Sequence, residues 1–209
     1  MRALANLIFT TDFFYSILRV TTPLLFASMG AVLSDVAGVP NIALEGMMLI
    51  AAFAGMFFSY LFDSAAMGLL FALLFAVLSA GVLAFFTLYY KTNIILGGIA
   101  INSLASGGTI FFLYLAAHDK GTSVSLPSKV LPSVNIPLIQ DIPVIGPAIS
   151  GHNVLTYLAI VAVIFTFFLL KRTSLGWHLR AVGEKKEAAD SVGISVAKTQ
   201  AIALILSGL

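Results

Sequence analysis

"AAMGLLFALLFAVLSAGVLAFFTLYY", residues 65–90, contains no charged side chain and is the clearest membrane span in the sequence. A hydrocarbon core about 30 Å thick is crossed by a helix of about 20 apolar residues, and this stretch is long enough. The whole chain of 209 residues is 60% hydrophobic and only 10% charged. Soluble domains carry about 25% charged residues, which form their polar surface. We therefore predict an all-α, polytopic integral membrane protein surrounded by lipid.

Four other segments are long and apolar enough to span a bilayer: 16–33, 41–62, 94–116 and 152–170. A further apolar segment begins near Thr199 and covers only about half a span at Leu209. The sequence thus predicts about five full transmembrane helices plus the start of a sixth, in a single transmembrane domain over residues 1–209. The incomplete helix predicts a fragment or a truncated product, with a short terminal half-helix as the alternative.

Lysine and arginine residues are unevenly distributed among the connecting segments. Six of the 11 lie in residues 171–198, and alternation of the spans puts Lys91 on the same side. Arg2, Lys120 and Lys129 fall on the opposite side. Because cytoplasmic loops are enriched in Lys and Arg, we predict that 171–198 is cytoplasmic and that the N-terminus and 117–151 are extracytoplasmic.

The predicted extracytoplasmic loop, residues 117–151, contains five of the 7 prolines. Proline fixes φ and removes a backbone donor, which excludes a long helix or a central strand in this loop. Long irregular loops are commonly either functional or disordered. The loop is therefore either a docking surface for something delivered from outside or an irregular connector.

The sequence offers little that supports catalysis or metal binding. It has no cysteine and no phosphate-binding glycine loop, and its 3 histidines show no metal-ligand spacing. The net charge of +2 gives no argument for nucleic-acid binding. We therefore predict a protein that is not an enzyme and that itself binds no metal or cofactor.

The predicted cytoplasmic segment contains a helix-forming run rich in Glu, Lys and Ala at residues 184–192, between Gly183 and Gly193. With about two and a half turns, such a helix is too short to be stable alone in water. Its small residues and mixed charges suit a groove on a partner protein. The alternative is an ordinary solvated loop that follows the distribution of positive charge.

In and directly after this run, Glu187-Ala188-Ala189, then three intervening residues and Gly193, match the EAA-x-x-x-G pattern of permease subunits of bacterial ABC importers. Three stretches resemble the branched-chain amino acid and simple-sugar permease family: "TSLGWHLRAVGEKKEAADSVGISVAKTQAIALILSG" (173–208), "GVPNIALEGMMLIAAFAG" (38–55) and "NIILGGIAINSLASGGTIFFLY" (93–114). Within that family the chain looks most like the nucleoside and simple-sugar uptake permeases. The resemblance covers about residues 19–209.

The resemblance implies a subunit of an ATP-driven importer of nucleosides or simple sugars in the bacterial cytoplasmic membrane. It implies cytoplasmic ABC ATPase subunits that bind ATP and Mg²⁺, a second permease subunit, identical or not, and an extracytoplasmic substrate-binding lipoprotein. A branched-chain amino acid importer is the alternative within the family. An unrelated channel or secondary carrier is the alternative outside it.

The resemblance also implies that the short cytoplasmic helix contacts the ATPase and couples its movement to the membrane helices. The expected coupling residues are Glu184, Glu187, Ala188, Ala189 and Gly193. Glu187 is expected to supply a polar anchor, and the two alanines to leave room for close docking. Gly193 is expected to let the chain turn back.

Asn93 and Asn102 are the candidates for the substrate path. A carboxamide within a membrane protein needs hydrogen-bond partners, and sugar hydroxyls or base edges are suitable ones. The glycine, alanine and serine residues around them are expected mainly to let helices pack closely.

Asn41, Glu45 and Gly46 are expected to form a structural latch or gate near the cytoplasmic mouth of the path. Asn41 is a good N-cap for the span 41–62, and Glu45 then lies near the positive end of that helix. The alternatives are an interfacial carboxylate that complements the helix dipole and pairs with Arg19 or Arg172, and, less favoured, a direct contact between Glu45 and substrate. Neither Glu45 nor Arg19 is expected to reach the middle of the membrane, which argues against a channel or a proton-coupled carrier.

Overall fold

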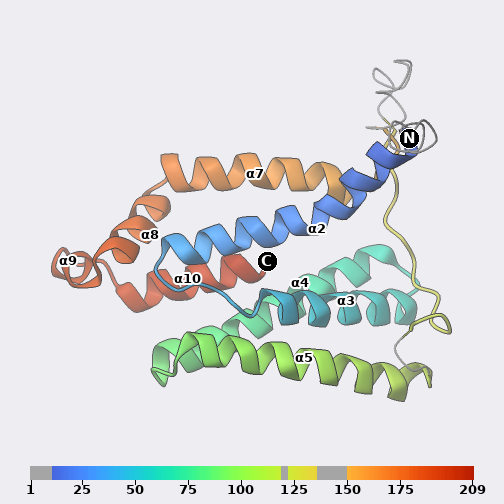
Figure 1. Cartoon of the computed structure of the whole chain (residues 1–209), viewed down its shortest axis with the longest axis horizontal. Coiled ribbons are helices and arrows are strands. Elements are labelled where there is room, and N and C mark those ends of the chain that lie inside the picture. The colour runs from blue at the N-terminus through green and yellow to red at the C-terminus, as the bar shows by residue number, and fades with distance from the viewer. Residues whose placement is uncertain (1–10, 119–121, 136–149) are drawn as a thin grey trace, which may run out of the picture. The chain divides into compact units, whose positions relative to one another are not determined.

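The computed structural model describes residues 11–118, 122–135 and 150–209. These residues form helices joined by turns and irregular segments, with one isolated antiparallel bridge between Ser133 and Asn153. In chain order (Figure 1), the elements are α2 (Thr11–Val36), α3 (Leu44–Leu61), α4 (Ala65–Ala84), the π-helix η1 (Phe85–Tyr89), α5 (Ile94–Ala117), α7 (Val154–Arg172), α8 (Ser174–Glu184), α9 (Lys186–Ser191) and α10 (Val196–Gly208). The predicted all-α class is confirmed.

Five stretches of helix are long and apolar enough to cross a membrane: α2, α3, α4 with η1, α5 and α7. Their number confirms the prediction of five spans. The largest difference in bounds is at α2, which begins at Thr11, so that Arg19 and Pro23 lie within the helix and not in its first turns. The last helix, α10, begins at Val196, three residues before the predicted start at Thr199.

Much of the predicted loop 117–151 lies outside the described residues, as do Arg2 and Lys120. Within residues 122–135, Lys129 contacts the last turns of α3 and the turn that follows this helix. Its backbone N–H donates to Ser59 Oγ at 3.0 Å, and its Nζ forms an ion pair with Asp63 at 3.1 Å. This contact leaves open whether the loop is a docking surface or a connector.

The described residues divide into two compact units, with boundaries inside α2 and α7. The first unit comprises residues 11–28 and the described part of 131–165. In this unit, the ring of Tyr15 stacks on His152 with centroids 4.0 Å apart, and its hydroxyl donates to the Gly151 carbonyl at 3.1 Å. The Thr22 hydroxyl donates to that of Thr156 at 3.2 Å, so the first half of α2 packs against α7.

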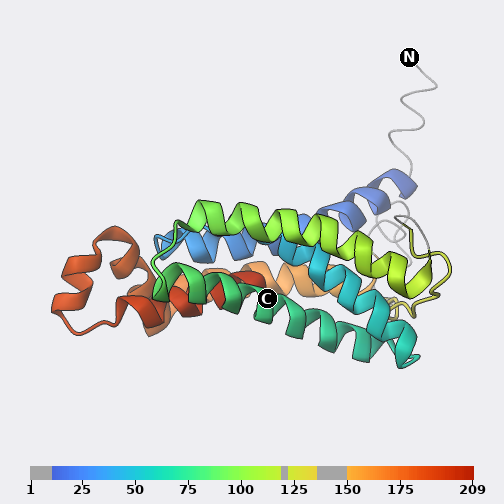
Figure 2. The ribbon, with the colours of Figure 1, turned by 90° about the horizontal axis from the view of Figure 1, so that it is seen from below.

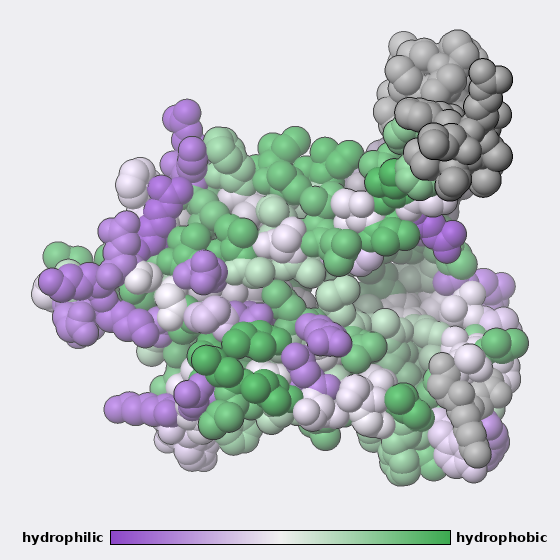
Figure 3. Space-filling model, in the orientation of Figure 1, coloured by the Kyte–Doolittle hydropathy of each residue, from purple (hydrophilic) through white to green (hydrophobic). Residues whose placement is uncertain are grey.

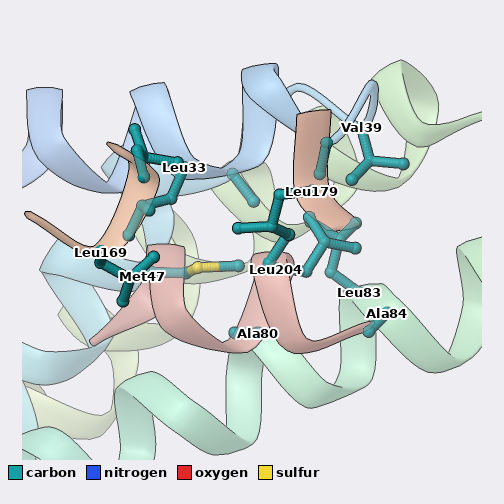
Figure 4. Packing of buried hydrophobic residues seen from close by; sticks show 13 residues of the cluster. Leu33, Val39, Met47, Ala80, Leu83, Ala84, Leu169, Leu179 and Leu204 are labelled. Atoms are coloured by element: carbon teal, nitrogen blue, oxygen red, sulfur yellow. The ribbon is translucent and has the colours of Figure 1, made fainter. Parts of the chain in front are cut away.

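The second unit comprises residues 29–130 and 166–209. In this unit, α3 packs against α4 and α5, and α10 packs against α4 and α8. Their buried side chains form one apolar cluster (Figure 4), with Met47, Leu83, Leu179 and Leu204 almost completely inaccessible. A Cβ atom at Gly30 would overlap the Ser207 carbonyl, so the end of α2 contacts the α10 backbone directly.

Within the second unit, α3 begins partway along α4 and α5, as Figures 1 and 2 both show. The connection from α2, residues 37–43, therefore enters the interior, and Ala37, Val39, Asn41 and Ala43 are all buried. Non-helical backbone at membrane depth is tolerated where protein surrounds it. In the structure, α3 thus starts in the interior of this unit and not level with the ends of α4 and α5.

Hydrophilic side chains gather at the end of the second unit that α8 and α9 form, whereas apolar side chains cover the long helices (Figure 3). Segment 171–198, predicted to lie outside the bilayer, contains the last two residues of α7, all of α8 and α9, and the start of α10. The distribution of polar side chains agrees with a position of α8 and α9 in water. The cytoplasmic side of this segment stays a prediction.

Candidate functional site

The segment predicted as one helix over residues 184–192 forms parts of two helices. The first, α8, ends at Glu184, and the second, α9, begins at Lys186. Lys185 separates them with an extended backbone, at φ −154° and ψ 100°. Glu184 therefore does not share a helix with Glu187, and Gly183, the predicted boundary, lies inside α8.

The helix α8 was not predicted, although the sequence carries a signal for it. Thr173 has an extended backbone, and its hydroxyl accepts a hydrogen bond from the Gly176 N–H at 3.2 Å, as an N-cap does. Leu179 and Val182, three residues apart on one face, are fully buried. A Cβ atom at Gly183 would overlap the Val36 carbonyl, so α8 packs backbone to backbone against the end of α2.

Gly183→Ala is therefore expected to lower the free energy of unfolding by about 1–3 kcal/mol, the usual effect of overpacking. The overlapping atom is a backbone oxygen, which has little freedom to move away. Thermal unfolding of the purified protein in detergent measures the effect. Gly107→Ala is the matched control, because nothing lies within 4 Å of a Cβ atom there. Equal unfolding midpoints for the two variants would contradict the close packing of α8.

The short helix α9 presents only part of its predicted docking residues to solvent. Glu187 and Ala188 are exposed, and so is Glu184 at the end of α8. Ala189 is only 3% exposed, so the expectation that it leaves room for a docking partner is wrong. Gly193 has a φ of +85°, which confirms that the chain turns there. We call the exposed residues Glu184, Glu187 and Ala188 the α9 surface.

The start of α3 is held by the buried side chain of Asn41. Its Nδ2 donates to Ser207 Oγ at 2.7 Å, and its Oδ1 accepts from the Ala43 N–H at 3.0 Å. Its backbone N–H donates to Ser34 Oγ at 3.1 Å. The N-cap position of α3 belongs to Ala43, so the prediction that Asn41 is the N-cap is wrong. Asn41 forms the turn before the helix and connects it to α10.

Asn102 also holds the start of α3. Its Oδ1 accepts a hydrogen bond from the Gly46 N–H at 2.8 Å, and its Nδ2 donates to the Ile42 carbonyl at 2.9 Å. A Cβ atom at Gly46 would lie 2.7 Å from this Oδ1, so the close contact requires glycine. The structure thus gives the Asn102 carboxamide a structural role, in contrast to the expected place on the substrate path.

Glu45 lies deeper than the sequence indicated. It is in the first turn of α3, next to Gly46, whose partner Asn102 is eight residues beyond the start of α5. At a rise of 1.5 Å per residue this corresponds to about 12 Å, close to half of a hydrocarbon core of about 30 Å. Glu45 thus lies level with the interior of α5 and not with its end, while its position relative to the membrane surface stays a prediction. The connection 37–43 folds inward, and this carries the start of α3 with it.

The position of Glu45 near the positive end of α3 is confirmed. Its expected ion pair with Arg172 is not found among the described residues. The ion pair present there joins Lys129 and Asp63. Arg19 belongs to the other unit, so its pairing with Glu45 stays a prediction. The Glu45 side chain is exposed within the second unit.

Asn93 is the N-cap of α5, where its Oδ1 accepts from the Ile95 N–H at 2.8 Å. It also lies at one end of a cavity of about 550 Å³ between α4–η1 and α5. The other lining residues are almost all apolar, including Phe86, Leu96 and Leu104. Because such walls offer few partners to a hydroxyl-rich substrate, this cavity does not support the expected role of Asn93 in the substrate path.

The five apolar helices and the polar end at α8 and α9 define a multi-pass membrane protein. The chain belongs to the family described as the branched-chain amino acid transport system / permease component, whose profile matches residues 13–209. This confirms the resemblance noted in the sequence and the position in the cytoplasmic membrane. Members of this family are transport components and not enzymes.

Three relatives show how far the similarity extends. The guanosine ABC transporter permease protein NupQ of Bacillus subtilis is 34% identical, over 90% of this chain and 60% of its own length. The nucleoside ABC transporter permease protein NupC of Lactococcus lactis is 32% identical, over 90% of this chain and 61% of its own length. The putative glucose ABC transporter permease protein TsgC13 of Haloferax volcanii is 32% identical, over 91% and 57%. The chain thus spans about 60% of the length of these relatives, and no solved structure matches it.

Proposed function

We propose that this chain forms part of the membrane path of an ATP-driven importer for a nucleoside or a simple sugar. The names of the relatives support this substrate class over a branched-chain amino acid. The observation that carries the proposal is structural. The helix α9 packs against α8, and α8 contributes Leu179 to the same apolar cluster that contains Ala43 and Met47 at the start of α3.

The partners follow from the family. Of two ABC ATPase subunits, which bind ATP and Mg²⁺, one would dock on the α9 surface from the cytoplasm. A second permease subunit would complete the path, and a substrate-binding lipoprotein would deliver substrate to the outer side. The exposed Glu187 and Ala188 support the first of these contacts, since they offer a polar anchor beside a small side chain.

The packing offers a route by which movement of α9 would reach the path. The neighbouring helix α8 packs against the end of α2 at Gly183 and against α10. Ser207 of α10 in turn holds Asn41, directly before α3. We infer that a shift of α9 is passed through these packed elements to the start of α3, as in other rigid-element transitions.

Glu45 is the residue that we place on the substrate path. A carboxylate that faced lipid at this depth would be costly, so a polar environment has to surround it. It shares one exposed face of α3 with Met48 and Leu49, away from α4 and α5. Transporters commonly build their substrate sites where a helix begins near the midplane. The Glu45 carboxylate would accept hydrogen bonds from the hydroxyls of a sugar or ribose ring.

Glu45→Gln is expected to raise the substrate concentration for half-maximal uptake about tenfold, because a hydrogen bond to a charged group contributes about 1.5–3 kcal/mol. Uptake by vesicles that contain the whole importer measures this change. Asp35→Asn, at an exposed position near the end of α2, is the control for loss of a carboxylate. Poor assembly of the importer with an unchanged affinity would instead support a latch and contradict a substrate contact.

Reconstitution of the complete importer tests the proposed function. The chain, its second permease subunit, the ATPase and the binding lipoprotein are placed in vesicles and supplied with guanosine, ribose or leucine. We expect ATP-dependent uptake of the nucleoside or the sugar. Uptake of leucine alone would favour the branched-chain amino acid importer, and flux without ATP would favour a channel or a secondary carrier.

A further inference from the structure

The cavity between α4–η1 and α5 has the form of a groove that runs along α5. It extends from Asn93 to Leu104, about 16 Å along α5 at 1.5 Å per residue. Val82, Phe86 and Leu96 form part of its walls. Its volume of about 550 Å³ lies within the usual range of ligand sites.

The two ends of the groove differ in polarity. Thr92 and Asn93 line one end, and Lys91 directly precedes them. Lys91 is exposed and forms no ion pair within the described part of the chain. Tyr89 and Tyr90, which are 72% and 60% exposed, mark this end as the interfacial one, where aromatic side chains concentrate. The groove therefore runs from the polar residues Thr92 and Asn93, which follow the exposed Lys91 in the chain, to apolar walls.

The backbone on one side of the groove is irregular. The last turn of the α4 span is the π-helix η1, a form that occurs frequently at functional sites. The Thr87 hydroxyl of η1 is buried without a hydrogen-bond partner in the described residues. On the opposite wall is Gly97, where a Cβ atom would lie 3.1 Å from Leu83 Cδ1 and 4.0 Å from this hydroxyl.

We propose that this groove binds a membrane phospholipid, with an acyl chain along the apolar walls and an anionic headgroup at Lys91. The match in charge identifies the occupant, because an unpaired lysine at the interface attracts anionic headgroups. The groove also opens toward the bilayer, since the wall residues Leu96 and Leu104 are 67% and 72% exposed. The site is separate from the α9 surface and from Glu45, and does not depend on the proposed transport function.

Photoactivatable phosphatidylglycerol tests the site in the full chain. The protein is placed in nanodiscs of phosphatidylcholine that contain this lipid, with a diazirine in the acyl chain, and the adducts are mapped by mass spectrometry. We expect adducts concentrated at the groove walls between residues 82 and 104. Ala100→Phe, which fills the groove, should remove these adducts, whereas Ser103→Phe on the same helix should retain them.

Lys91→Gln tests the headgroup and keeps the experiment informative if Ala100→Phe does not fold. The preference for phosphatidylglycerol over photoactivatable phosphatidylcholine should fall about fivefold, from the usual contribution of one lysine near an anionic surface. Lys198→Gln, another exposed lysine outside the groove, should leave the preference unchanged. Adducts spread evenly over all exposed helix faces, equal labelling by both lipids, or adducts unaffected by Ala100→Phe would each overturn the proposal.

Discussion

ATP-dependent uptake is expected to fall about tenfold or more when Gly193 is replaced by proline. The Gly193 N–H donates to the Asp190 carbonyl at 2.9 Å, and the Ile194 N–H donates to the Ala189 carbonyl at 3.0 Å. These two bonds close the C-terminus of α9 around a residue with φ +85°. Proline fixes φ near −65° and has no N–H, so the six-residue helix would lose its end. Uptake by vesicles containing the whole importer measures the effect.

Gly193→Asn is the matched control, because asparagine keeps the N–H and tolerates the left-handed conformation. It should retain most of the uptake. Membrane insertion of both variants should be normal, since nothing lies within 4 Å of a Cβ atom at this position. Uptake by the proline variant equal to that of the unmodified protein would show that α9 does not couple the ATPase to transport.

Asn41→Ala is expected to lower the free energy of unfolding by about 2–4 kcal/mol and to abolish uptake. The variant loses the bond to Ser207 and leaves the buried Ala43 N–H without its acceptor. Each buried group left unpaired costs about 1–3 kcal/mol. Uptake fails because the start of α3 is no longer tied to α10. Thermal unfolding in detergent and uptake by reconstituted vesicles measure the two effects.

Asn93→Ala provides the comparison, because it removes the same carboxamide from an exposed N-cap. The loss of its single bond to the Ile95 N–H should cost about 1 kcal/mol. Uptake should remain, since Asn93 has no contact with the start of α3. Equal losses of stability in the two variants would contradict the view that Asn41 holds the start of α3 to α10.

The sequence predicts the spans well, because an apolar run of about 20 residues is a local property that determines helix and environment together. It also predicts the turn at Gly193, which depends on one residue. The helix α8 was missed although Thr173 and the spacing of Leu179 and Val182 indicate it. The helix was instead predicted at residues 184–192, because this stretch is rich in the helix-forming residues Glu, Lys and Ala.

The position at which α3 starts could not be predicted, because it depends on contacts between residues far apart in the chain. Ser207, the partner of Asn41, is 166 residues away, and Asn102, the partner of Gly46, is 56 residues away. The local sequence "GVPNIALEG" fits a surface turn before a span equally well. The burial of Ala189 was also unpredictable, because a six-residue helix is too short to show a clear apolar face in the sequence.

The proposal that Glu45 lies deep in the membrane on a polar path can be tested by the reactivity of a cysteine at position 45. The chain has no native cysteine, so a single substitution gives an unambiguous signal. Glu45→Cys in the assembled importer should react with a small, charged thiol reagent and be protected by substrate. Ile99→Cys, on an exposed part of α5 at nearly the same depth, should remain unreactive in lipid. An unreactive cysteine at position 45, or equal reactivity at both positions without protection by substrate, would contradict the claim.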